Sequence, residues 1–151
     1  MPSSETRDPI NAYRMICGVI TAMPVLYMAV AVVLKQTEVL TATGMGNLDP
    51  VSGLPITLAV VVLGTLSSTA SILVKVLLLR SFPVQDRTPD VRFKATLITM
   101  AVSESGAVMG LTLILITGSL LYGGLLCGLS FAVTCFHFPS RYWLESGDSV
   151  L

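Results

Sequence analysis

Long stretches of the chain carry no charged side chain, and short polar stretches separate them. Met15–Leu34 contains 20 residues without Asp, Glu, Lys or Arg, and residues 50–74 contain 25 more. The segment Ser105–Ser140 adds 36 uncharged residues. About 20 apolar residues in a helix cross the hydrocarbon core of a bilayer, and in lipid every backbone hydrogen bond must be made within the protein. The pattern therefore predicts membrane helices, and the last run is long enough for more than one crossing.

Turn signals divide the last run and complete the predicted topology. Thr117, Gly118 and Ser119 interrupt it, and Gly123-Gly124 follows after a short apolar stretch. We predict four helices, at about 14–34, 54–79, 93–117 and 120–138. Short connections favour antiparallel neighbours, so the predicted fold is an all-α, polytopic bundle of four antiparallel transmembrane helices. Residues 14–138 form this membrane domain, and 1–13 and 139–151 are its tails.

The basic residues predict the orientation of the bundle. Only Lys35 lies between the first two predicted helices, whereas the N-terminal segment, the second loop with its flanks, and the tail hold most of the others: Arg7, Arg14, Arg80, Arg87, Arg92, Lys94 and Arg141. Cytoplasmic loops of membrane proteins are enriched in Lys and Arg. Both termini are therefore expected in the cytoplasm, and we expect a multi-pass protein of a bacterial inner membrane.

Composition excludes several classes of protein. Hydrophobic residues make up 53% of the 151 residues and charged ones 12%, against about 25% charged in soluble domains. Nine basic and nine acidic residues give no net charge, which argues against a nucleic-acid partner because such binding depends on phosphate contacts. The expected partners are the lipid bilayer and either further copies of the chain or other membrane subunits.

Few residues have the chemistry of an enzyme or a metal site. Cys17, Cys127 and Cys135 fall inside predicted helices, where they are expected to pack as small hydrophobic residues. His137 lies next to aromatic residues at the end of the fourth helix and is expected at the membrane interface. No second His or acid stands at ligand spacing beside it. We therefore expect no enzymatic activity, no cofactor and no metal.

Glu104 is the one acid predicted deep in the membrane. It lies ten residues beyond Lys94, which is about 15 Å along a helix and near the middle of a core about 30 Å thick. A charged side chain there costs roughly 2.5–3.5 kcal/mol on insertion scales. Two interpretations stay open: Glu104 binds a proton or cation, or it is a neutral hydrogen-bond donor that joins two helices.

Small residues surround this position on two predicted helices. Gly106 and Gly110 are spaced by four, a pattern that lets helices approach closely, and Gly64 with three serines forms a matching surface on the second helix. Asp86 lies near the middle of the loop between the second and third predicted helices. Ser68 and Glu104 are equally far from Asp86 in the sequence, so an antiparallel hairpin places them at the same level. The candidate ion-binding set is therefore Glu104, Ser105, Ser67, Ser68 and Ser71, and the alternative for the serines is plain close packing.

The segment Met100–Ile116, with the sequence MAVSESGAVMGLTLILI, resembles the outer helix of the rotor-ring proteolipid, the c subunit of F-type and V-type rotary ATPases. The pair Glu104-Ser105 is similar to the sodium-binding variants of that family. The family is a helical hairpin with a polar loop, and the polar loop before this segment is similar to it. The resemblance covers about residues 60–117. The resemblance implies an ion-carrying carboxyl group in an oligomeric membrane subunit.

The chain also departs from that family. Its second helix has Gly64 but no series of alternate glycines and no Gln, and helices stand on both sides of the hairpin. Two functional hypotheses follow. One is an ion- or proton-carrying proteolipid-like subunit that uses Glu104, and the other is a small interaction or assembly subunit without transport activity.

Overall fold

The protein is an all-α, multi-pass membrane protein. The computed structural model describes residues 9–42, 54–83 and 86–146. In these ranges, four helices are long and apolar enough to cross a membrane: α1 (Pro9–Gln36), α3 (Leu54–Arg80), α4 (Pro89–Thr117) and α5 (Leu120–His137). Two short helices, α2 (Val39–Ala42) and α6 (Arg141–Ser146), follow α1 and α5. The predicted fold class is confirmed.

Two helices begin earlier than the charge pattern predicted. α1 begins at Pro9 rather than near residue 14, and α4 begins at Pro89 rather than near residue 93. Proline suits the first helical position because its missing N–H would be unpaired there anyway. Thr88 caps α4 by accepting a hydrogen bond from the Val91 amide. The first turn of α4, with Asp90 and Arg92, is therefore part of the helix despite its charges. Residues 1–8 and 147–151 of the predicted tails lie outside the described residues.

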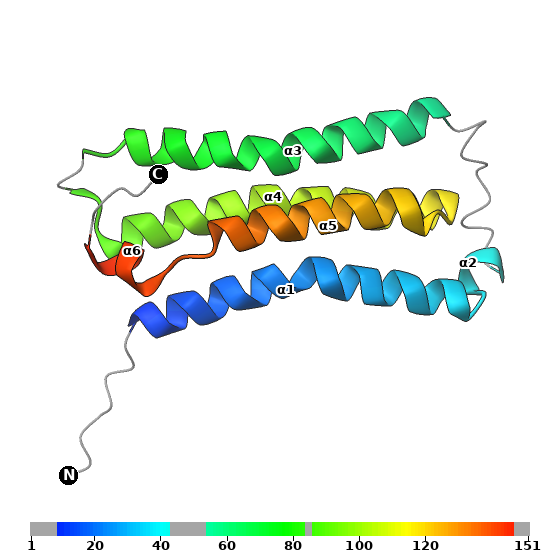
Figure 1. The fold of residues 1–151 in the computed structure, drawn as a ribbon, viewed down its shortest axis with the longest axis horizontal. Helices are drawn as coiled ribbons and strands as arrows, with labels where there is room; N and C mark the ends of the chain where they lie inside the picture. Colours follow the sequence, from blue (N-terminus) through cyan, green and yellow to red (C-terminus); the bar gives the residue numbers. More distant parts are fainter. Residues whose placement is uncertain (1–8, 43–53, 84–85, 147–151) are drawn as a thin grey trace, which may run out of the picture.

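The α4–α5 pair lies between α3 and α1, which flank it on opposite sides (Figure 1). Helices that follow one another are antiparallel, whereas α1 and α4 run in the same direction. The starts of α1 and α4, the end of α3, and α6 lie together at one end, called here the α6 end. The segments predicted as cytoplasmic that the structure describes thus share one end of the bundle.

Glycines allow α4 to contact α3 and α5 almost backbone to backbone. A Cβ atom at Gly106 would lie 2.9 Å from the Gly64 carbonyl oxygen of α3, and one at Gly110 would lie 2.7 Å from the Gly123 carbonyl oxygen of α5. The three glycines predicted to pack helices, Gly64, Gly106 and Gly110, are therefore all used inside the chain. Their faces join α3, α4 and α5 rather than being exposed.

Polar side chains are enriched in the interior of the bundle, and its outer surface is apolar. Several hydroxyl-bearing residues are fully buried, including Ser68, Ser71, Thr96, Ser103 and Thr134. Large hydrophobic residues of α1 and α3 are exposed along their outer faces. This distribution suits a lipid environment, where buried hydroxyl groups can form hydrogen bonds between helices. Polar groups on the outer surface would have no water to bond to.

Candidate functional site

Glu104 occupies the middle of α4 and is half-buried. It is the sixteenth of the 29 residues of this helix, one position past the midpoint. The Tyr27 hydroxyl group of α1 donates a hydrogen bond of 2.8 Å to Oε1 of its carboxylate. Within the described ranges, this is the only hydrogen bond that the carboxylate makes. The acid therefore faces α1, and its partner is a phenol.

Tyr27 reaches Glu104 because α1 and α4 run parallel in constant register. Tyr13 bonds to Asp90 and Tyr27 bonds to Glu104, and both pairs are separated by 77 residues in the sequence. The Tyr13 ring also stacks on Phe93, with ring centroids 4.1 Å apart. Because both helices rise by the same distance per residue, one matched pair near the start brings the other pair together 14 residues later.

Pro24 bends α1 one turn before Tyr27. Proline lacks the N–H that would bond to the carbonyl four residues earlier, and its ring crowds that carbonyl. Pro24 is buried and lies near the middle of α1, and α1 bends near the middle of its length (Figure 1). The bend keeps the second half of α1 along the α4–α5 pair, which is where Tyr27 must lie to meet the carboxylate.

The serines of α3 lie at the level predicted from the hairpin. The Ser67 hydroxyl bonds to the Ser105 hydroxyl and also donates to the Val102 carbonyl at 3.1 Å. Ser68 donates to the Ser103 carbonyl at 3.3 Å. These contacts pair α3 and α4 about the position of Asp86, so the predicted register is confirmed.

These hydroxyl groups bond to partners other than the carboxylate. Ser67 and Ser105 bond to each other, Ser68 faces Gly106, and Ser71 bonds to the Ser68 carbonyl and to α5. They lie on the side of α4 that faces α3, whereas Glu104 is bonded to α1. A role of Ser67, Ser68, Ser71 and Ser105 in ion binding stays a prediction.

A second group of hydroxyls joins α4 to α5 at the same depth. Ser130 donates to the Ser103 carbonyl at 2.6 Å, Ser103 donates to the Ser130 carbonyl at 3.3 Å, and Thr134 bonds to the Ser103 hydroxyl. All three residues are fully buried. Sequence reasoning missed this group, although Ser130 and Thr134 are spaced by four and so share one helical face.

His137 is the last residue of α5, and its side chain is buried between helices. Its side chain is 1% exposed, and its Nε2 atom lies 3.0 Å from the Ser71 hydroxyl of α3. α6 follows the end of α5 and packs against α4 and α1, with Leu144 fully buried. The predicted place of His137 at the membrane interface stays a prediction, and the structure adds that the side chain is enclosed between helices.

The cysteines and acids do not assemble a metal site in the described residues. No group of three or more His, Cys, Asp or Glu comes together there. Cys17 and Cys127 are buried as predicted, whereas Cys135 is exposed on the outer surface of α5.

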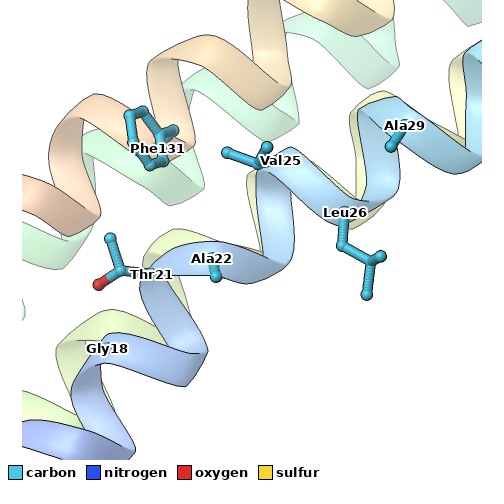
Figure 2. Close-up of a pocket in the computed structure, with 7 residues that line it drawn as sticks. All are labelled: Gly18, Thr21, Ala22, Val25, Leu26, Ala29 and Phe131. Atoms are coloured by element: carbon cyan, nitrogen blue, oxygen red, sulfur yellow. The ribbon is translucent and has the colours of Figure 1, made fainter.

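An apolar groove runs along the outer side of α1 next to α5. Its volume is about 500 Å3, and Figure 2 shows its lining of small and apolar side chains from α1, with Phe131 of α5 on the far side: Gly18, Thr21, Ala22, Val25, Leu26 and Ala29. A Cβ at Gly18 would meet nothing within 4 Å. The groove is separate from the Tyr27–Glu104 pair, and nothing polar lines it except Thr21, whose hydroxyl bonds to the Cys17 carbonyl.

A carboxyl group bonded to a single phenol can gain and lose a proton without rearrangement of the helices. The ionised form accepts the bond from Tyr27, and in the protonated form one oxygen remains an acceptor. Comparison with family models, with curated proteins and with solved structures gave no match for this chain.

Proposed function

We propose that this protein binds and releases a proton at Glu104 within the membrane, and so acts as a proton-carrying subunit rather than an enzyme. The observation that carries the proposal is the half-buried carboxylate in the middle of α4, bonded to Tyr27 of the neighbouring α1. Ionisable residues inside membrane helices are expensive to keep, and those retained commonly serve proton or ion movement.

The partners of Glu104 favour a proton over a metal cation. A bound cation requires several oxygen lone pairs that point at one place. At Glu104 the neighbouring phenol donates a hydrogen bond to the carboxylate, so its hydrogen points at the place where a cation would bind. The serine hydroxyls that would complete a cation shell bond to other partners. Binding a proton requires only the carboxyl group itself, and the single donor Tyr27 leaves the other carboxylate oxygen available for it.

Tyr27 would hold the carboxyl group in place in both protonation states. When Glu104 is ionised, the phenol donates to the anion, and a hydrogen bond to a charged group contributes about 1.5–3 kcal/mol. When Glu104 is protonated, the phenol still has a neutral oxygen to donate to. The proton can then leave on the side of the carboxyl group that Tyr27 does not cover.

Infrared spectroscopy of the protein in lipid vesicles tests the proposal. The carboxyl C=O band of Glu104 should appear and disappear as pH is changed, and Glu104→Gln should remove that band. The matched control is Glu38→Gln, which removes an exposed carboxylate at the far end of α1 and should leave the band unchanged. The proposal is refuted if the difference spectra of Glu104→Gln and wild type are identical.

Reaction with a hydrophobic carbodiimide gives an independent test of the site. Such reagents modify protonated carboxyl groups in membranes, so labelling should depend on pH and be lost in Glu104→Gln. Tyr27→Phe removes the phenol hydroxyl without changing the size of the ring, and we expect it to label faster because one oxygen loses its partner. Equal rates in Tyr27→Phe and wild type would mean that the Tyr27 contact is unimportant.

The second candidate function is a membrane interaction or assembly subunit without transport. The groove along α1 favours it, because Gly18 and Ala22 are spaced by four and open to the outside, a pattern found where membrane helices meet. Cross-linking at position 22 in native membranes tests this function. A cross-linked species would support it, and its absence together with a titrating Glu104 would leave the proton-carrying function alone.

A further inference from the structure

Three buried polar atoms in the α6 half of the bundle have no hydrogen-bond partner among the described residues. They are Nδ1 of His137 on α5, Oγ1 of Thr96 on α4 and Nε of Arg14 on α1. The His137 side chain is 1% exposed and Thr96 is fully buried. A buried polar group without a partner destabilises the fold, so these atoms require an explanation.

The contacts between α4 and α5 place the Thr96 and His137 atoms at the same level. Ser103 of α4 bonds to Ser130 and Thr134 of α5. Since the two helices are antiparallel, residues before Ser103 lie beside residues after Thr134. Thr96 is two turns before Ser103, on the same helical face, and it is therefore level with His137 at the end of α5.

Ser71 determines which nitrogen of His137 carries the proton. The Ser71 hydroxyl has one hydrogen, and it donates that hydrogen to the Ser68 carbonyl at 2.6 Å. Ser71 can therefore only accept from His137, whose Nε2 lies 3.0 Å away. Nε2 is then the protonated nitrogen, and in a neutral imidazole Nδ1 keeps a free lone pair.

Thr96 and Thr57 differ from the other buried threonines of the described helices, because their hydroxyl groups have no partner. Thr21, Thr112 and Thr134 each donate to the carbonyl four residues earlier in their own helix. Thr96 makes no such bond in the structure. The hydrogen of its hydroxyl group therefore has no acceptor among the described residues, at the level of a nitrogen that can only accept.

We propose that His137 and Thr96 bind one water molecule between α4 and α5, which donates to Nδ1 of His137 and accepts from Oγ1 of Thr96. Buried waters typically bond to polar groups that have no other partner.

This water lies on the path by which a proton reaches Glu104 from the α6 end, a statement that rests on the proposed function. Thr96 is eight residues before Glu104, which is about 12 Å along α4. A hydrated site at this depth shortens the apolar distance that a proton must cross from the end of the bundle.

His137 is the only histidine of the chain, so nuclear magnetic resonance of histidine-labelled protein in bilayers reports this site without ambiguity. We expect a protonated Nε2, an unprotonated Nδ1, and magnetisation transfer from water to the ring. Thr96→Val, which has the shape of threonine without the hydroxyl group, should lose the transfer and keep the tautomer. Thr112→Val is the matched control on the exposed side of α4 and should keep both.

Three results would overturn the inference: a protonated Nδ1 in wild type, a ring without water transfer, or transfer that persists in Thr96→Val. The path is tested by the rate at which the Glu104 carboxyl band responds to a pH jump, which Thr96→Val should slow and Thr112→Val should not. An unchanged rate in Thr96→Val refutes the path alone. A water signal at His137 with a Glu104 that does not titrate refutes the proposed function and leaves the water site standing.

Discussion

Substitution of Gly106 by alanine tests the packing of α4 against α3. The added Cβ would lie 2.0 Å from the Ser68 hydroxyl oxygen and 2.9 Å from the Gly64 carbonyl oxygen. The hydroxyl can rotate away, but it then loses its bond to the Ser103 carbonyl. The carbonyl belongs to the backbone of α3, so the two helices must separate by roughly half an ångström to restore an ordinary contact.

The expected loss of stability follows from these two contacts. Overpacking in a well-packed interior costs about 1–3 kcal/mol, and loss of the Ser68 bond costs about 1 kcal/mol. Alanine recovers about 1 kcal/mol through its higher helix propensity. We therefore expect Gly106→Ala to lower the free energy of unfolding by about 1–3 kcal/mol.

Equilibrium unfolding in detergent micelles measures this difference. Gly18→Ala is the matched control, because its Cβ would meet nothing within 4 Å, and we expect it to gain up to about 1 kcal/mol. Adding Ser68→Ala to Gly106→Ala should restore part of the loss, since it removes the closer of the two contacts. If Gly106→Ala and Gly18→Ala prove equally stable, the close approach of α3 and α4 is wrong.

Three further predictions concern the ends and the surface of the bundle. Gly118, with φ of 67°, ends α4 in the left-handed region, so Gly118→Ala should destabilise by about 1 kcal/mol in the same unfolding assay. Thr88→Ala removes the cap of α4 and should cost about 0.5–1 kcal/mol, at the low end for such caps because the bond to the amide is 3.4 Å long; an unchanged stability would exclude a capping role. A membrane-permeant maleimide should modify Cys135 and not the two buried cysteines, and peptide mass spectrometry would show which cysteines are modified. Modification of Cys17 before Cys135 would contradict the packing of α1.

Sequence reasoning identified the elements around Glu104 and the level at which they meet. A short loop forces α3 and α4 to be antiparallel neighbours, so reflection about Asp86 was enough to place the α3 serines beside Ser103 and Ser105. The partner of Glu104 was not found because no short connection links α1 to α4.

The absence of charge determined four apolar helices from sequence alone, because a bilayer excludes charged groups whatever the neighbouring helices are. Only the tertiary structure decided which side of each helix meets which neighbour. Rotation of α4 about its axis turns Glu104 towards Tyr27 of α1 and Ser105 towards Ser67 of α3. The packing of α5 against α3 places His137 beside Ser71. In lipid, apolar faces are nearly equivalent, so helix rotation depends on glycine contacts and interhelical hydrogen bonds that no single helix contains.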